Sequence, residues 1–182
     1  MKIAVYGKGH VGGGLADLWE KKGHQVTRLG HEGGDISQAD VVLIAVPGDK
    51  LSGAMEKLKG VEGKTVIDAT NVIKSKPPAG FASNAEFVKS KTNGPTAKSF
   101  NINFAKLYEK LSSAREKPGN LWCGDDEARA VVEQLSRDAG YEPVSMGPLT
   151  NAAQQESMIG PVFAIAQASG PFFYRIATPE KF

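Results

Sequence analysis

Three glycines near the amino terminus have the spacing that phosphate binding requires. Gly7, Gly9 and Gly12 form the pattern G-x-G-x-x-G, between the apolar run Ile3–Tyr6 and an amphipathic segment that begins at Leu15. In a strand–loop–helix unit the first glycine permits a tight turn, the second lets a pyrophosphate approach the backbone, and the third lets the helix pack on the strand. The helix N-terminus then offers unpaired N–H groups to the phosphates. The loop predicts a dinucleotide site, the alternative being a glycine-rich turn that binds nothing. The residues expected at the pyrophosphate are Gly7, Lys8, Gly9, His10, Val11 and Gly12.

The end of the second predicted strand, Gln25–Leu29, is where such a site distinguishes the two nicotinamide dinucleotides. An Asp or Glu there accepts from the ribose 2′-OH, whereas basic groups accommodate a 2′-phosphate. No carboxylate ends this strand, and Arg28 and His31 flank Gly30. The pattern favours NADP (NADPH), with these three residues at the 2′-phosphate. Two other interpretations stay open: Arg28 as a solvated residue without a ligand, and Glu32 as a partner of the ribose.

Two further apolar runs, Val41–Val46 and Lys64–Ala69, predict central parallel strands. Ligands of doubly wound sheets bind beyond the carboxyl ends of such strands. The alternative is that Pro47 only ends a strand and Asn71 only makes a turn. The residues expected to contact the nicotinamide half are Ala45, Val46, Pro47, Ala69, Thr70 and Asn71.

The elements that must position these residues follow from periodicity and turn signals. Only eleven residues, 31–41, separate the second strand from the next apolar run, too few for a usual crossover helix, so Gly33–Ile36 predicts a short loop or brief strand and an open adenine pocket. Predicted helices are Gly13–Lys22, a helix capped by Asp49, Ser83–Lys91, Asn103–Ser112, and one capped by Asp125 and ended by Gly140. Predicted strands are Thr96–Phe100, Asn120–Gly124 and Glu142–Met146. An exposed loop is expected over 72–81.

This order of elements predicts an α/β fold, a doubly wound Rossmann-type parallel sheet with a short C-terminal helical extension. The Rossmann domain would cover residues 1–149 and the extension residues 150–182. The extension is apolar, should kink at Gly160-Pro161, and ends in the aromatic segment 170–174. It is expected to pack over the nicotinamide face, cover a sheet edge or form a dimer contact.

The amino-acid composition limits the classes of protein to which the chain can belong. The chain has 182 residues, 41% of them hydrophobic and 23% charged, with a formal net charge of +2. This balance gives no reason to expect a nucleic-acid or membrane partner. Cys123 is the single cysteine, which rules out an internal disulfide and fits a reducing cytosol. No signal peptide precedes the first strand, and no apolar run approaches the roughly 20 residues that span a bilayer. A cytoplasmic location is expected.

Other chemistry finds no support in the sequence. His10, His24 and His31 lack metal-ligand spacing, so no metal site is expected. No G-x-S-x-G nucleophile motif occurs, and Asp125-Asp126 opens a helix, so the catalytic residues stay unknown. A dinucleotide site without an acid or base suits hydride transfer between two bound redox cofactors, which needs positioning more than proton transfer.

Several segments together resemble the NADP oxidoreductases that depend on coenzyme F420, over roughly residues 2–157. These segments are Gly7–Gly12, Ala45–Pro47, Asp68–Asn71, Lys98–Asn101, Gly124–Asp126, Gly140–Val144 and Gly147–Leu149. The resemblance implies a Rossmann domain that binds NADP(H), and a smaller C-terminal part that helps to form a homodimer and a deazaflavin pocket. It implies direct hydride transfer between the two cofactors. By the same resemblance Phe100 and Asn101 would shape the side of the second substrate.

The chain departs from this family in its few basic residues after the second strand, the missing helix there and the shorter tail. The leading expectation, which comes from the resemblance and not from these departures, is a small-molecule redox substrate as acceptor, either coenzyme F420 or a flavin. Two alternatives stay open: a non-catalytic NADP(H)-binding sensor or regulatory protein, and a truncated β-hydroxyacid dehydrogenase-like reductase, whose relatives need a helical domain of roughly a hundred residues. Membrane metalloreductases are disfavoured because no membrane-spanning segment is present.

Overall fold

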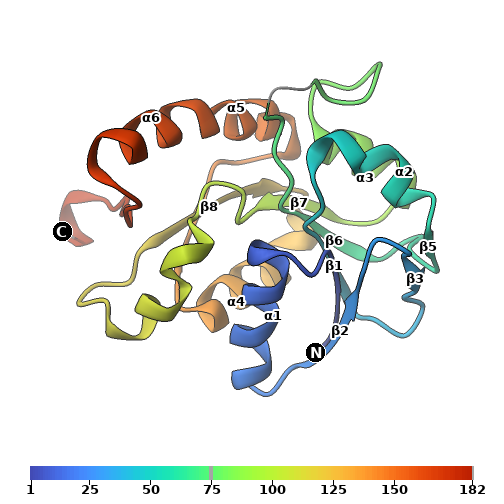
Figure 1. Cartoon of the computed structure of the whole chain (residues 1–182), viewed down its shortest axis with the longest axis horizontal. Coiled ribbons are helices and arrows are strands. Elements are labelled where there is room, and N and C mark those ends of the chain that lie inside the picture. The colour runs from blue at the N-terminus through green and yellow to red at the C-terminus, as the bar shows by residue number, and fades with distance from the viewer. Residues whose placement is uncertain (74–75, 182) are drawn as a thin grey trace.

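The computed structural model describes residues 1–73 and 76–181 and has a mixed α/β fold (Figure 1). The strands are β1 Lys2–Tyr6, β2 Gln25–Leu29, β3 Gly34–Asp35, β4 Val41–Ile44, β5 Leu58–Lys59, β6 Thr65–Asp68, β7 Thr96–Ser99, β8 Gly119–Gly124 and β9 Glu142–Ser145. The α-helices are α1 His10–Lys21, α2 Leu51–Met55, α3 Asn84–Thr92, α4 Arg129–Ala139, α5 Ala152–Ser157 and α6 Ile159–Ser169. Short 3₁₀-helices are η1 Gly48–Lys50, η2 Ala105–Ser113, η3 Asp126–Ala128, η4 Leu149–Asn151 and η5 Pro179–Lys181.

Seven strands form the main sheet in the order β2-β1-β4-β6-β7-β8-β9. Every neighbouring pair is parallel except β7 and β8, which are antiparallel with Lys98 opposite Cys123. The sheet is thus mainly parallel, as expected, with one antiparallel pair. The chain leaves β7 at its carboxyl end and re-enters the sheet, as β8, at that same end. There the Phe100 N–H donates to Asn120 Oδ1 (3.2 Å). Because this connection does not cross the sheet, β8 must run in the opposite direction.

Strand β4 shows how both faces of the sheet are buried. Val41 and Leu43 face the layer of α1, α4 and η2, whereas Val42 and Ile44 face the layer of α2 and α3. All four side chains are at most 1% exposed. A continuous apolar run is what a strand covered on both faces requires, which is why Val41–Ile44 carries no polar residue.

The link between β2 and β4 contains no helix, as its length predicts. β3 instead pairs in parallel with β5 in a separate two-stranded sheet. Lys57 holds the segment between β2 and β3 in place. Its Nζ donates to the carbonyl of His31 (2.9 Å), and its own carbonyl accepts from the Gly34 N–H (3.1 Å). The end of β2 is therefore anchored where the predicted 2′-phosphate contacts lie.

Helix boundaries follow the predicted caps only in part. Ser83 Oγ accepts from the Glu86 N–H (3.1 Å), which confirms that cap. Neither Asp49 nor Asp125 makes a side-chain cap; the Asp125 carboxylate instead accepts from Lys89 Nζ (2.7 Å) and the Thr96 N–H (2.8 Å). The predicted helix 103–112 is the 3₁₀-helix η2. Residues 74 and 75 of the predicted loop 72–81 lie outside the described residues.

The extension consists of two helices that lie along one side of the molecule (Figure 1). They are separated at Met158, and Pro161 explains the break because it has no N–H to offer to the carbonyl of Ser157. α5 is partly buried against β8 and α3, whereas Val162 is the one buried residue of α6. No helix in the described part of the chain is long and apolar enough to cross a membrane.

Candidate functional site

A cleft of about 580 Å³ lies at the carboxyl ends of β1, β4 and β6. β1 and β4 are neighbours in the sheet, and the chain order reverses between them, which is where doubly wound sheets bind ligands. Every predicted cofactor contact except Gly12 and Arg28 lines this cleft. The lining residues are Tyr6, Gly7, Lys8, Gly9, His10, Val11, Gly30, His31, Ala45, Val46, Pro47, Gly48, Asp49, Ala69, Thr70, Asn71 and Ile73.

The three motif glycines differ in what a side chain would meet. Gly7 has a φ of +117°, and a Cβ on it would lie 2.3 Å from the Ala45 carbonyl oxygen. A Cβ on Gly12 would lie 2.0 Å from the Gly7 oxygen, so these two glycines let strand and helix approach closely. A Cβ on Gly9 would meet no protein atom within 4 Å. Packing therefore does not require glycine at position 9, and the space above it opens into the cleft.

The N-terminus of α1 points its backbone donors at the same space. Gly9 is the N-cap residue and provides no side-chain acceptor, and the first turn carries no acidic residue. The first N–H groups of an α-helix have no partner within the helix and carry a partial positive charge. A phosphate group fits this combination of free donors, positive potential and open space.

The carboxylate of Glu32, which the sequence leaves open as a partner of the ribose, stands at the tip of β2. The Glu32 carboxylate lies over Gly30, 2.5 and 2.7 Å from where a Cβ of that glycine would be. Its oxygens lie 4.0 Å from Lys8 Nζ and 3.4 Å from His31 Nδ1. Its pKa is lowered, first by a hydrogen bond from its own backbone N–H and further by the charge of Lys8. Lys8 and His31 thus surround an anion that belongs to the chain itself.

Arg28 is turned away from the cleft. Its guanidinium donates to Glu20 Oε1 (2.8 Å) and also pairs with Asp17, both on the exposed side of α1. The expectation that Arg28 meets a 2′-phosphate is therefore not met, because two carboxylates already hold its planar fork. Gly12 likewise lies beneath the loop, where its role is packing.

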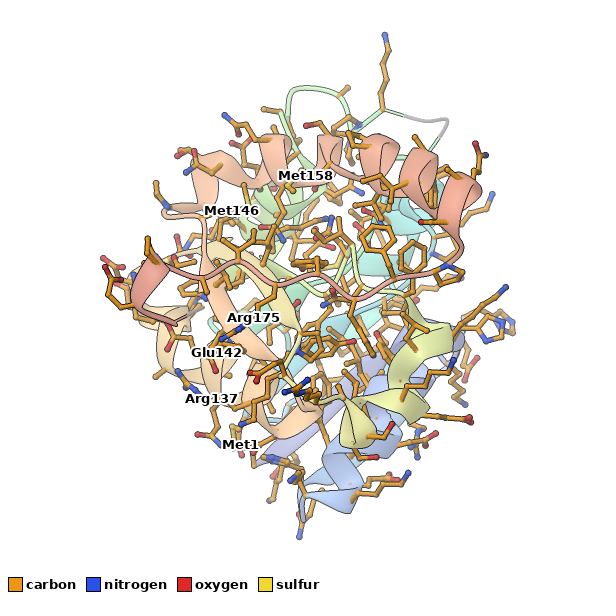
Figure 2. All side chains as sticks on the ribbon, turned by 90° about the vertical axis from the view of Figure 1, so that its left-hand side faces the viewer. Met1, Arg137, Glu142, Met146, Met158 and Arg175 are labelled. Carbon is orange, nitrogen blue, oxygen red and sulfur yellow. The ribbon has the colours of Figure 1, made fainter. Side chains whose placement is uncertain are left out.

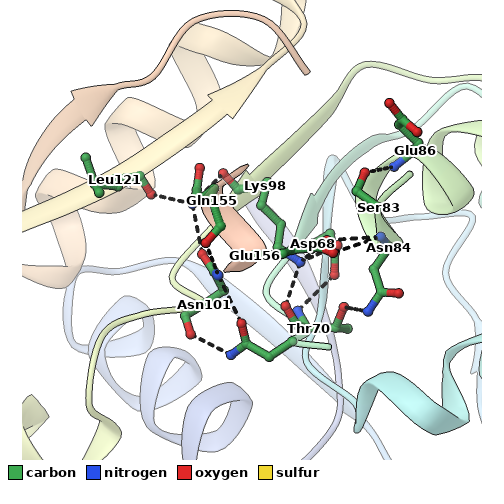
Figure 3. A network of polar contacts seen from close by, with 11 residues as sticks. Asp68, Thr70, Ser83, Asn84, Glu86, Lys98, Asn101, Leu121, Gln155 and Glu156 are labelled. Atoms are coloured by element: carbon green, nitrogen blue, oxygen red, sulfur yellow. Dashed lines mark hydrogen bonds and ion pairs between the residues drawn. The ribbon is translucent and has the colours of Figure 1, made fainter. Parts of the chain in front are cut away.

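Three side-chain amides meet at the far end of the cleft (Figure 3). Asn71 Nδ2 donates to the Asn101 carbonyl (2.6 Å), and Asn101 Nδ2 donates back to Asn71 Oδ1 (3.0 Å). Gln155 on α5 donates from Nε2 to Asn101 Oδ1 (2.8 Å). Sequence reasoning missed Gln155, since nothing in its local sequence indicates that α5 packs against the ends of β6 and β7.

The predicted substrate-side residue Phe100 does not face the cleft. Its ring is 0% exposed and packs edge-on against Trp19 and Tyr141, with ring centroids 5.8 and 6.5 Å away. Its φ of +60° is unusual for a residue with a large side chain. The strained backbone sends the ring into the core and the next residue, Asn101, toward Asn71.

A buried ion cluster supports the same strand ends. Lys98 Nζ lies 2.8 Å from both Asp68 and Glu156 carboxylate oxygens and donates to the Thr70 carbonyl (2.6 Å). Glu156 also accepts from the Asn84 N–H at the start of α3 (3.0 Å). Burial raises the pKa of Glu156, and the charge of Lys98 opposes this shift. The cluster ties β6, β7, α3 and α5 together beside Asn71.

Other parts of the described chain offer no comparable chemistry. A groove of about 760 Å³ runs between β9 and the returning tail, bordered by Glu142 and Arg175 (Figure 2), and none of its lining residues belongs to the glycine loop. Burial raises the pKa of the Cys123 thiol to about 12, so this cysteine is no ready nucleophile. No cluster of metal-ligating side chains occurs within residues 1–73 and 76–181.

Known proteins resemble the chain in different degrees. No protein-family model matches it. The metalloreductase STEAP3 of Rattus norvegicus is 29% identical over 128 residues, which cover 68% of this chain and 25% of STEAP3. The chain thus spans about a quarter of the length of that relative.

Solved structures match over more of the chain. A protein from Arthrobacter sp. FB24, provisionally described as an F420-dependent NADP reductase, has a TM-score of 0.80 and 22% identity, covering 98% of this chain and 100% of that one. Hypothetical protein SMa0349 from Sinorhizobium meliloti has a TM-score of 0.64 and 24% identity, covering 84% and 88%. A reductive aminase from Aspergillus terreus, in complex with NADPH and ethyl levulinate, has a TM-score of 0.63 and 14% identity, covering 92% and 62%. The resemblance to the first of these proteins and the Rossmann-type α/β fold are confirmed.

Proposed function

We propose that the chain is an oxidoreductase that binds NADP(H) in the cleft at the end of β1 and transfers a hydride between it and a deazaflavin or flavin-like acceptor. One observation carries the proposal: the uncapped N-terminus of α1 and the open space above Gly9 lie together in the cleft where the chain order reverses. Free backbone donors, a helix dipole and room for a phosphate are the features by which such folds bind the pyrophosphate of a dinucleotide, and together they support the proposal.

Each part of the dinucleotide has residues that fit it. The pyrophosphate would lie on the N–H groups of Gly9, His10 and Val11. The 2′-phosphate would lie between Lys8 and His31, which requires the Glu32 carboxylate to move aside. The nicotinamide end would lie beyond β4 and β6, among residues that the cleft already brings together: Ala45, Val46, Pro47, Ala69, Thr70 and Asn71.

Bound NADPH would supply a hydride to the acceptor ring, and a proton taken up from solvent would complete the reduction. The chain's part would be to hold the two rings in contact. Ile73 lines the same cleft and is 47% exposed, and it offers an apolar surface to the acceptor.

The relatives support a nicotinamide cofactor, but they do not favour one particular acceptor. The Arthrobacter protein is described as dependent on F420 and NADP, and the reductive aminase was solved with NADPH. Because these likenesses lie below 25% identity, the acceptor rests on motif resemblance alone.

We also propose a cytoplasmic homodimer. α6 contains no charged residue, and its Phe163 and Ile165 side chains are 40% and 50% exposed, so the helix presents an apolar surface that a second copy would cover. The unpaired, buried Cys123 is consistent with a reducing compartment.

The test has two stages. NADPH and NADH are first titrated into the purified chain, and tighter binding of NADPH is expected. NADPH is then mixed with the chain and either coenzyme F420 or FMN, and the nicotinamide absorbance is followed; acceptor-dependent loss of absorbance is expected. Binding without turnover for either acceptor would favour a non-catalytic sensor, and no binding of either dinucleotide would overturn the proposal.

A further inference from the structure

The side chains of Gln155, Asn101 and Asn71 connect the C-terminal extension to the cleft (Figure 3). Gln155 is fully buried on α5, Asn101 follows β7 and is 5% exposed, and Asn71 follows β6 and lines the cleft. Three elements that are distant in sequence therefore meet through one chain of amide hydrogen bonds at the proposed nicotinamide end.

The direction of every hydrogen bond in this chain is fixed by backbone carbonyls. Gln155 Nε2 donates to the Leu121 carbonyl (3.0 Å) as well as to Asn101 Oδ1. A carbonyl can only accept, so the amide nitrogen of Gln155 must face it. Asn101 must then present its oxygen to Gln155 and its nitrogen to Asn71. Asn71 in turn presents its oxygen to Asn101, and its nitrogen donates to the Asn101 carbonyl.

Of the three amides only Asn71 lines the cleft, and it keeps hydrogen-bonding capacity that the amide chain does not use. Both N–H groups of the Asn101 side chain are used, one on Asn71 Oδ1 and the other on the Gln155 carbonyl (3.4 Å). The Asn71 amide uses one N–H and one lone pair, so one of each remains. A primary carboxamide, such as that of nicotinamide, can bond to both.

Two costly features surround Asn101. Phe100, which precedes it, is a buried aromatic residue with a φ of +60°. Gln155 Oε1 is buried and has no hydrogen-bond partner among the described residues. Each feature carries a cost in free energy, and such features are uncommon at ordinary core positions. Their coincidence indicates that the placement of Asn101 serves more than packing.

We propose that Gln155 and Asn101 are positioning residues for the nicotinamide end of the site. They hold Asn71 so that its free N–H and lone pair meet the carboxamide of the cofactor. This inference rests on the proposed function and adds that α5, in the extension, belongs to the redox half of the site.

The test separates the nicotinamide from the rest of the cofactor. Dissociation constants of NADPH and of 2′-phospho-ADP-ribose, which lacks the nicotinamide, are measured for wild type, Gln155→Leu and Asn101→Asp. Gln155→Leu removes the donor at similar volume, and Asn101→Asp places an oxygen against Asn71 Oδ1. Because each change removes or misdirects one hydrogen bond, NADPH should bind about five- to tenfold more weakly in both variants. The phospho-ADP-ribose affinity should change by less than about twofold.

Ser90→Ala is the control, because it removes a side-chain hydrogen bond, from the Ser90 hydroxyl to the Phe87 carbonyl (2.7 Å), that lies inside α3 and outside the cleft lining. It should leave the ratio of the two affinities unchanged. An equal loss of affinity for NADPH and for phospho-ADP-ribose, or no loss of affinity for either, would overturn the positioning role. If Gln155→Leu fails to fold, the isosteric Asn101→Asp variant decides. A wild-type chain that binds neither ligand would instead overturn the proposed function, and this inference with it.

Discussion

Glu32 stands where the proposed site must choose between the two dinucleotides. Its carboxylate lies over Gly30, between Lys8 and His31, and would repel a 2′-phosphate that uses the same two cations. A ribose 2′-OH could instead donate to it. The residue therefore limits how strongly the chain prefers NADPH.

Removing this carboxylate should increase the preference for NADPH. In Glu32→Ala, Lys8 and His31 are free to meet the 2′-phosphate, so the ratio of NADPH to NADH affinity should rise about fivefold, the size of one exposed charge contact. Fluorescence titrations with both dinucleotides measure the ratio. Glu62→Ala, an exposed carboxylate outside the cleft lining, is the control. An unchanged or falling ratio would contradict this role of Glu32. A rise that comes only from weaker NADH binding, with NADPH binding unchanged, would instead show that Glu32 accepts from the ribose 2′-OH of NADH.

Arg28 shows why residue roles at this tip could not be assigned from sequence. A basic residue at the end of the second strand fits a phosphate contact, and the motif contains no sign that it is already occupied. Asp17 and Glu20 lie on the preceding helix, and only the packing of α1 on β2 brings them to the guanidinium. The sequence leaves Glu32 open as a ribose partner, and its carboxylate does lie over Gly30.

At the scale of elements, the packing of α1 on β1 depends on Gly12. A Cβ there would lie 2.0 Å from the Gly7 carbonyl oxygen, which is backbone and cannot turn away. Gly12→Ala should therefore lower the free energy of unfolding by about 1–3 kcal/mol, as overpacking a core does. Thermal or urea unfolding measures it. Gly53→Ala is the control, since a Cβ at Gly53 would meet no atom within 4 Å. Equal stability of the two variants would contradict this description of the loop.

The ion cluster makes the junction of α5 with the sheet sensitive to pH. Burial raises the pKa of Glu156 above its usual value, so the folded state binds this proton more tightly than the unfolded state. The contribution to stability is present below the unfolded pKa and is lost as pH rises through the folded pKa. Glu156→Gln does not titrate, so its melting temperature relative to wild type should rise with pH over this range.

Melting curves of Glu156→Gln and wild type from about pH 4 to pH 8 test this expectation. Gln154→Ala, exposed on the same helix, controls for general effects of pH. If the melting temperature of Glu156→Gln relative to wild type falls with rising pH, the charge of Lys98, 2.8 Å from Glu156, outweighs the cost of burying the carboxylate.

The elements could be predicted where local sequence decides them and not where tertiary contacts do. The glycine pattern, the apolar run Val41–Ile44 and the Ser83 cap are local, and all three are found in the structure. The reversal of β8 depends on where the chain after Phe100 returns, which no local pattern encodes. The amide chain ending at Gln155 depends on α5 reaching β7, so sequence indicated Asn71 and Asn101 but not the residue that holds them.

At the scale of the whole molecule, α6 buries Val162 but presents the exposed apolar side chains of Phe163 and Ile165. A homodimer through this helix should be disrupted by Phe163→Glu, which would bury an unpaired charge and weaken association about a hundredfold. Sedimentation velocity over a range of concentrations measures the change. Ser52→Glu, exposed on α2, adds the same charge elsewhere and should leave association unchanged. A wild-type chain that stays monomeric at all concentrations would contradict the dimer.

The central claim is that the space above Gly9 receives the pyrophosphate of a nicotinamide dinucleotide. Gly9 has a φ of −74° and a ψ of −170°, which alanine adopts freely, and a Cβ there would meet no protein atom within 4 Å. The most direct measurement is a calorimetric titration of NADPH into wild type and Gly9→Ala. The structure leads us to expect binding to wild type, binding at least about tenfold weaker to the variant, and equal melting temperatures without ligand. No binding to wild type, or equal affinity in the two proteins, would contradict the claim.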